Sequence, residues 1–168
     1  GRRRFTIFPP EQFENLYVGP LENTPAGRAV SMVDFHAPDF DAHPRFAEAL
    51  RYAQVVELEP GDAVYIPSMW WHHVEVLDPF NVLVNYWWRD TPAFLGQPQE
   101  ALNHAILAIR DLPREERNFW RKLFDHYVFE NPAEVTDHIP EQARGILSPL
   151  TSRTAGQIRA FLLRTLNR

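Results

Sequence analysis

The stretch that decides the fold is Gly61-Asp62-Ala63-Val64-Tyr65-Ile66-Pro67-Ser68-Met69-Trp70-Trp71-His72-His73-Val74-Glu75-Val76. It opens with a turn signal, because glycine followed by aspartate favours a tight turn. The next four residues, 63–66, are apolar and end at a proline, which predicts a short buried strand. Apolar and polar residues then alternate over 72–77, which predicts a second strand. Because neighbouring residues of a strand point to opposite faces, His72 and His73 should lie on different sides of the sheet.

A third strand is predicted directly after the second. Asp78-Pro79 forms a turn, and residues 80–88 are mostly apolar and aromatic. Three strands joined by such short turns predict an antiparallel meander, in which His72 would face Asn85 on the next strand. A histidine aimed at an asparagine in this way is typical of a small polar site inside a β-barrel.

The remaining expected elements divide the chain into a β-rich half and a helical half. The first half adds strands at 4–8 and 54–58, a helical turn at 11–16, a long loop over 17–44 and a helix at 44–53. In the second half apolar residues recur at three- and four-residue steps, which predicts helices near 98–112 and 113–127, after Pro140, and after an N-cap at Ser152. We therefore expect a mainly β domain at 1–90 followed by a helical region at 91–168.

Composition excludes several classes of protein. The chain has 168 residues and a formal charge of −5, which argues against a nucleic-acid partner. It has no cysteine, so disulfides and thiolate metal sites are excluded. No run is apolar enough for a membrane span, and residues 1–20 lack the apolar core of a signal peptide. We expect a cytoplasmic protein, and since the first residue is Gly1, with no methionine before it, we expect a piece of a longer one.

His72 is the main candidate for chemistry. A neutral imidazole on a strand inside a barrel is a good ligand for iron, zinc or nickel. A site of two histidines and one carboxylate needs two more ligands, which normally come as His-x-Asp or His-x-Glu because alternate residues of a strand share a face. We identify no such pair, and the nearest match, Asp34-Phe35-His36, is reversed and lies in a loop. Spacing alone favours a buried histidine that bonds to a neighbouring backbone carbonyl.

The other candidates each have an ordinary structural explanation. His73 is expected at the surface or between sheets. The amide of Asn85 could bind a carboxylate or carbonyl, or satisfy a backbone group. Trp71 and Trp87 could wall a substrate pocket, although such tryptophans mostly pack in a core or at its rim. Three polar residues of the long loop could bind a metal or merely be solvated: Asp39, Asp41 and His43.

Four segments, in this order and spacing, resemble the JmjC-type cupin-like oxygenases, in particular their asparaginyl-hydroxylase-like branch and its bacterial relatives. The segments are Phe8-Pro9-Pro10-Glu11-Gln12-Phe13, Val33-Asp34-Phe35, 61–67 followed by Trp70-Trp71-His72-His73, and Val84-Asn85-Tyr86-Trp87. The resemblance covers about residues 1–90. It implies a cupin fold, a double-stranded β-helix or jelly roll, that binds Fe(II) and 2-oxoglutarate and hydroxylates a substrate with O2. A closed roll of this kind has about eight strands, so the five expected here would form a partial one.

The resemblance also implies roles for individual residues. His72 matches the distal histidine ligand of the iron, and Asn85 matches a residue near the 2-oxoglutarate. Trp71 and Trp87 match aromatic residues around the active site. Arg3 falls at the position of the lysine that binds 2-oxoglutarate, and although arginine is not equivalent to lysine, it can pair with a carboxylate bidentately. The His-x-Asp pair of the family is missing and would lie just before the first residue.

These observations predict the C-terminal part of an Fe(II)- and 2-oxoglutarate-dependent hydroxylase acting on a protein or a small molecule. Without the His-x-Asp pair, the 168-residue chain alone is expected to be inactive. The helices at 91–168 are expected to form a homodimer, as in several relatives. The alternatives are a non-catalytic cupin-like binding or dimerisation module, and a metal-dependent cupin such as an isomerase.

Overall fold

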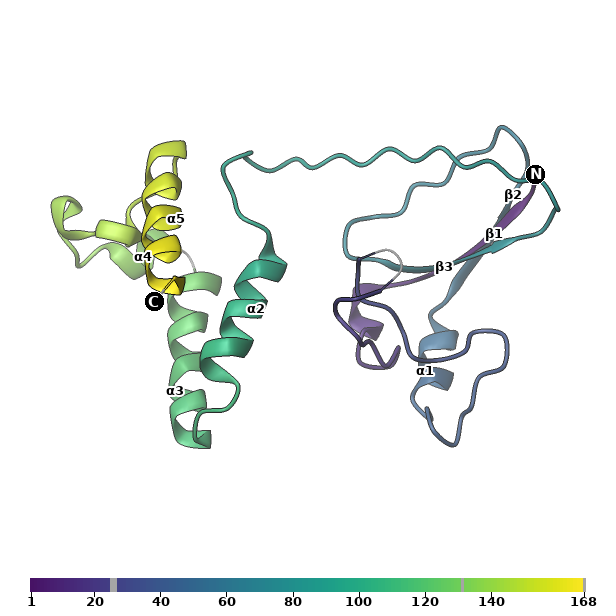
Figure 1. Ribbon diagram of the computed structural model, residues 1–168, viewed down its shortest axis with the longest axis horizontal. Coiled ribbons are helices and arrows are strands. Elements are labelled where there is room, and N and C mark those ends of the chain that lie inside the picture. Colours follow the sequence, from purple (N-terminus) through teal and green to yellow (C-terminus); the bar gives the residue numbers. More distant parts are fainter. Residues whose placement is uncertain (25–26, 131, 168) are drawn as a thin grey trace. The chain divides into compact units, whose positions relative to one another are not determined.

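The computed structural model describes residues 1–24, 27–130 and 132–167 (Figure 1). Residues 25 and 26, which belong to the predicted loop at 17–44, lie outside the described residues. The chain consists of two units, Gly1–Tyr86 and Trp87–Arg168. The predicted division into domains at 1–90 and 91–168 stays a prediction.

The first unit is built on a three-stranded antiparallel sheet with the strand order β2-β1-β3 (Figure 1). Its strands are β1 (Arg3–Phe8), β2 (Gln54–Leu58) and β3 (Trp71–Val76), as predicted for 4–8, 54–58 and 72–77. The central strand, β1, is rich in aromatic and β-branched residues, which suit a pleated surface covered on both sides. Four of its residues in a row are buried, Phe5 to Phe8.

Two predicted strands, 63–66 and 80–88, are wrong, because neither segment forms a strand. Their side chains suit a strand, but a strand also needs backbone hydrogen bonds to a neighbour. Neither segment pairs with the described sheet, whose strands are β2, β1 and β3 in that order. The segment 80–88 is strongly exposed, and Val84 within it is 69% exposed. The predicted meander is therefore replaced by a sheet in which β3 pairs with β1, far earlier in the sequence.

The core of the first unit lies against one face of this sheet. It is a buried cluster of Phe8, Leu16, Phe46 and Ala49, against which Trp71 packs. These residues come from β1, from the turn after η1 (Pro10–Gln12), from α1 (Phe46–Arg51) and from β3. The predicted helix at 44–53 is thus present in a shorter form, and its apolar side closes the core.

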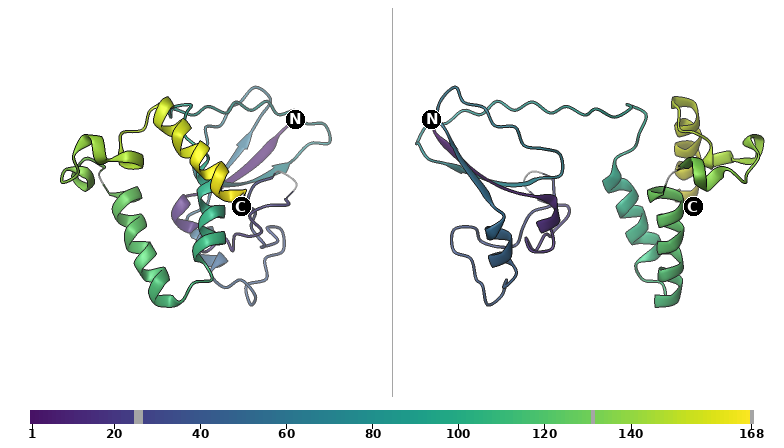
Figure 2. Two further views of the ribbon diagram at one scale, coloured as in Figure 1. Left: turned by 60° about the vertical axis from the view of Figure 1, so that its left-hand side comes forward. Right: turned by 180° about the vertical axis from the view of Figure 1, so that it is seen from behind.

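The second unit is helical (Figures 1 and 2). Its elements are α2 (Pro98–Ile109), α3 (Arg114–Phe124), the π-helical turn η2 (Asp125–Phe129), α4 (Pro132–Thr136), the 3-10 turns η3 (Glu141–Ala143) and η4 (Gly145–Leu147), and α5 (Ser152–Leu166). None of the helices in the described ranges is long and apolar enough to cross a membrane.

The last helix begins one residue earlier than its predicted cap implied. The N-cap of α5 is Thr151, whereas Ser152 is already its first helical residue. The side chain of Thr151 accepts a hydrogen bond from the backbone N–H of Thr154 at 3.2 Å, and the Thr154 hydroxyl accepts one from the backbone N–H of Thr151 at 2.8 Å. The two threonines therefore satisfy each other's free backbone groups, which Ser152 cannot do from inside the helix.

Candidate functional site

The register of the sheet decides which residues share a face, because directly opposite residues of an antiparallel pair point to the same side. Arg3 lies opposite Val76, and Ile7 lies opposite His72. One face, here called the His72 face, therefore carries Arg3, Phe5, Ile7, His72 and Val74. The opposite face, here called the Glu75 face, carries Arg4, Thr6, Phe8, Trp71, His73 and Glu75.

Arg3 and His72, two of the predicted site residues, thus lie on the same face. Four positions of β1 separate them, which is roughly 13 Å along the strand. Arg3 is half-buried and His72 is exposed, so the alternative that His72 is a buried histidine is wrong. The exposure leaves the imidazole of His72 accessible to a ligand.

Asn81 holds the side chain of Arg3 in place, a role that no sequence pattern predicted. The Nε of Arg3 donates a hydrogen bond to Oδ1 of Asn81. The Nδ2 of Asn81 in turn donates to the backbone carbonyl of Arg2 at 2.7 Å. Arg3 also lines a pocket of about 260 Å³, together with Leu58, Asp62 and Phe80.

The described residues do not complete an iron site at His72. An iron centre of the two-histidine, one-carboxylate type needs three protein ligands that converge. Among the residues that the structure describes, one group of three potential ligands lies close together, and it is His36, His73 and Glu75 on the opposite side of the sheet. His72 is not part of this group.

The other predicted site residues lie in three different settings. Trp71 lies on the Glu75 face and packs against the buried core cluster, which is the structural explanation considered for it. Asn85 is exposed and belongs to no strand. Trp87 belongs to the other unit and is 83% exposed. Their roles in binding 2-oxoglutarate or substrate stay predictions.

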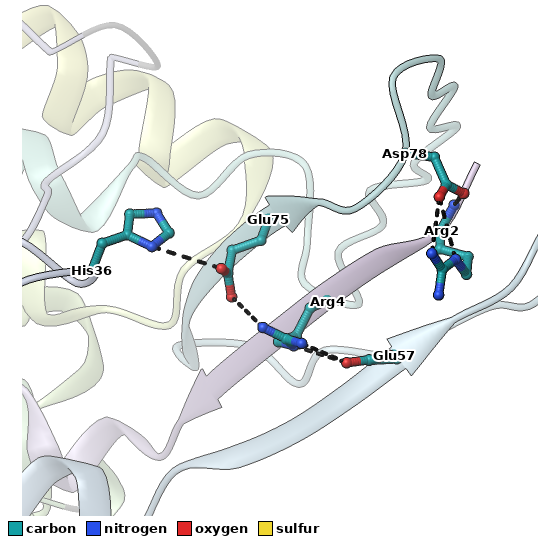
Figure 3. A network of polar contacts seen from close by, with 6 residues as sticks. All are labelled: Arg2, Arg4, His36, Glu57, Glu75 and Asp78. Carbon is teal, nitrogen blue, oxygen red and sulfur yellow. Dashed lines mark hydrogen bonds and ion pairs between the residues drawn. The ribbon is translucent and has the colours of Figure 1, made fainter.

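Charged side chains line up across the Glu75 face (Figure 3). The register places Arg4 opposite Glu57 on one side and opposite Glu75 on the other. Nη2 and Nε of Arg4 donate to Oε1 of Glu57 at 2.7 and 3.0 Å, while Nη1 lies 3.7 Å from Oε2 of Glu75. The second oxygen of Glu75, Oε1, lies 3.8 Å from Nδ1 of His36. Glu75 therefore stands between a guanidinium and an imidazole.

His73 is held in a half-buried position beside this carboxylate. Its ring stacks on Phe35 with centroids 4.1 Å apart, and its centroid lies 5.4 Å from that of His36. Burial lowers the pKa of His73 and so favours the neutral imidazole. Within the described part of the chain its Nε2 is buried and has no hydrogen-bond partner.

The loop that supplies His36 is shaped by its own aspartate. Oδ1 of Asp34 accepts hydrogen bonds from the backbone N–H groups of His36 at 2.9 Å and Ala37 at 3.3 Å. This turn uses the carboxylate of Asp34 locally and leaves the imidazole of His36 pointing to Glu75 (Figure 3). Asp39 makes a similar turn, in which its Oδ1 accepts hydrogen bonds from the backbone N–H groups of Asp41 and Ala42. This local role agrees with the structural explanation given for the polar loop.

The expectation that the chain contains no His-x-Asp or His-x-Glu pair was wrong. His73-Val74-Glu75 has the His-x-Glu spacing, and both side chains share a face of β3. The pair lies on the face of β3 that points away from His72. A third potential ligand, His36, comes from a loop on the same side as the pair.

Comparison with known proteins identifies the family. Residues 1–94 match the family described as "Cupin-like domain". The chain belongs to the cupin-like domain family. A small antiparallel sheet with several helices fits a cupin fold, and the resemblance to JmjC-type cupin-like proteins is confirmed by the relatives.

Three relatives illustrate the range of similar proteins. The cupin-like chain is 34% identical over 139 residues to HSPB1-associated protein 1 of Homo sapiens, which covers 82% of this chain and 26% of that protein. It is 29% identical over 137 residues to tRNA wybutosine-synthesizing protein 5 of Gallus gallus, and the match covers 73% of this chain and 40% of that protein. It is 34% identical over 89 residues to lysine-specific demethylase JMJ31 of Arabidopsis thaliana, and the match covers 53% of this chain and 16% of that protein. The chain thus spans between 16% and 40% of the length of these relatives.

Proposed function

We propose that this cupin-like chain is part of a hydroxylase that depends on Fe(II) and 2-oxoglutarate. Membership of a family with JmjC-type relatives, one of them named a demethylase, supports an oxygenase-type function. The structural observation that carries the proposal is that Arg3 and His72 share one face of the β1/β3 pair. A cation suited to a dicarboxylate and an imidazole suited to a metal therefore face the same space.

In this proposal several residues have a defined task. His72 provides one ligand to the iron, and Arg3, oriented by Asn81, pairs with a carboxylate of 2-oxoglutarate. The resemblance assigns Asn85 to the co-substrate and Trp87 to the substrate. Trp71, which packs against the core on the opposite face, has no task at this site. The iron, when bound, supplies the oxidising chemistry. Since the described residues offer His72 as a single ligand, the proposal requires the His-x-Asp pair predicted before residue 1, within a complete double-stranded β-helix.

The test is turnover of 2-oxoglutarate to succinate by the full-length gene product. His72→Ala should reduce succinate release to background, while the matched control His104→Ala, an exposed histidine of α2, should leave it unchanged. Arg3→Ala should raise the KM for 2-oxoglutarate by about 10- to 100-fold, because a charge-assisted pair contributes roughly 1.5–3 kcal/mol. Turnover retained in His72→Ala would remove His72 from the ligand set.

A non-catalytic binding or dimerisation module is the second candidate. It is favoured by one observation: the described residues bring no further ligand to His72. The two candidates separate in the same experiment. A module would show neither bound iron nor succinate release in the unmodified full-length protein.

We also propose that the second unit forms a homodimer in a cytoplasmic protein. α2 and α3 lie side by side (Figure 2). Their side chains line an apolar pocket of about 310 Å³ that includes Leu102, Ile106, Trp120 and Phe124. Phe119 of α3 is 60% exposed, although it is large and apolar. Light scattering should give the mass of a dimer, and Phe119→Glu should lower it, whereas the control Arg114→Glu changes charge on the same helix without removing apolar surface. A monomeric unmodified protein would contradict this proposal.

A further inference from the structure

His36, His73 and Glu75 converge on the Glu75 face, on the opposite side of the sheet from His72. Each offers one ligand atom, and the three atoms lie within 4.8 Å of one another. His73 and Glu75 are alternate residues of β3, so the strand itself places them side by side. His36 reaches them from the loop that Asp34 shapes.

We propose that these three side chains bind a divalent transition-metal ion such as Zn²⁺, and that this ion fastens the loop around His36 to β3. Two imidazoles and one carboxylate are an established donor set for zinc, which leaves a fourth position for water. The set contains no thiolate, consistent with a chain that has no cysteine. It also differs from the oxygen-only sets that Ca²⁺ and Mg²⁺ prefer.

The geometry lies within reach of a bound ion. Ligand atoms at zinc distances in a tetrahedral site are about 3.3 Å apart. Nδ1 of His36 and Oε1 of Glu75 are already 3.8 Å apart. The side chain of His36 is 68% exposed and lies in a loop, so it can close the remaining gap, while His73 and Glu75 are held by the strand.

His73 provides an independent observation that points to a ligand. Its Nε2 is buried and finds no hydrogen-bond partner among the described residues. Buried polar atoms are normally satisfied, so an unsatisfied one calls for a missing partner such as an ion. The stack on Phe35 holds the plane of the ring, as a ligand imidazole requires.

Arg4 does not block the site, because it engages the other side of Glu75. Its Nη1 lies 3.7 Å from Oε2, whereas Oε1 faces His36 (Figure 3). The shorter contacts of Arg4 go to Glu57, at 2.7 and 3.0 Å. Arg4 thus orients the carboxylate of Glu75 and leaves one oxygen for the metal, as partners of metal ligands commonly do.

The experiment measures Zn²⁺ binding to the metal-free 168-residue chain by competition with a chromophoric chelator, without 2-oxoglutarate. The unmodified chain should bind one Zn²⁺, and excess Zn²⁺ should raise its melting temperature. His36→Ala and Glu75→Gln should each weaken Zn²⁺ binding by at least about 100-fold. Mutation of a residue that only hydrogen-bonds to a metal ligand already lowers metal affinity by about 10- to 100-fold, and loss of a ligand itself should cost at least as much. Because His36 is an exposed loop residue, the His36→Ala variant should keep the fold of the unmodified chain. The melting temperature of this variant should no longer rise when Zn²⁺ is added.

Two controls make the result specific to this face. His104→Ala and His72→Ala should both retain the affinity of the unmodified chain, because neither residue belongs to the cluster. The proposal is overturned if the chain binds no Zn²⁺ saturably, or if His36→Ala and Glu75→Gln bind as tightly as the unmodified chain. It is also overturned if His72→Ala is the variant that loses binding. None of these readouts depends on succinate release, so the hydroxylase proposal can fail while this one stands.

Discussion

Truncation of Phe46 should be the most damaging single change in the first unit. Its side chain is 2% exposed, and its ring lies 6.3–6.4 Å from those of Phe8, Phe35 and Phe40. Removing a buried ring of this size loses about 2–3 kcal/mol of transfer free energy. The cavity left behind raises the total for Phe46→Ala to about 3–5 kcal/mol, a large part of the 5–15 kcal/mol that usually stabilises a domain.

The effect can be measured by urea unfolding followed by far-UV circular dichroism. With a slope of about 2 kcal/mol per molar urea, a loss of about 4 kcal/mol lowers the midpoint by about 2 M. Phe40→Ala is the matched control, because Phe40 stacks on the same ring but is 45% exposed, so it should cost less than about 1.5 kcal/mol. Equal costs for the two variants would show that Phe46 is not the centre of this core.

Two further predictions concern a surface ion pair and a helix cap. The backbone N–H and the guanidinium of Arg2 donate hydrogen bonds to Asp78 and lower the pKa of its carboxyl. The stabilisation of the fold by this pair is therefore complete above the ordinary pKa of 3.8, and it is lost as pH falls through the lowered pKa. The difference in urea midpoint between the unmodified chain and Asp78→Asn should therefore be largest at pH 7 and should shrink towards pH 2; a constant difference would contradict the role of ionisation. Thr151→Ala should cost about 1 kcal/mol in thermal or urea unfolding, since it removes the N-cap of α5. Ser152→Ala should cost less than about 0.5 kcal/mol, and the reverse order would restore Ser152 as the cap.

Local patterns were enough to locate the strands that the structure forms. β1 and β2 are short runs rich in aromatic and β-branched residues, and β3 alternates from His72 onward, all of which can be read without knowing the partners. The same patterns failed at 63–66 and 80–88. Both segments have suitable side chains, but strand formation also depends on pairing with a neighbouring strand, and this is not a local property.

Within the candidate site, the sequence could show which side chains point to opposite faces of the sheet more easily than which side chains contact one another. Alternation along β3 predicted that His72 and His73 point to opposite faces, and the register agrees. It could not show that Trp71 packs in the core, because its neighbours Phe8 and Phe46 lie on other elements. The hydrogen bond from Arg3 to Asn81 was equally inaccessible, since it joins residues far apart in the chain.

The sequence by itself therefore determined the family, the strands β1, β2 and β3, and the side of β3 on which each histidine lies. Only the tertiary structure decided that Arg3 shares a face with His72, and that His36 joins His73 and Glu75 on the other face. The physical reason is that the direction of a side chain follows from the local period of a strand. Contacts between residues such as His36 and Glu75 depend on how a loop and a strand pack together, which no local pattern records.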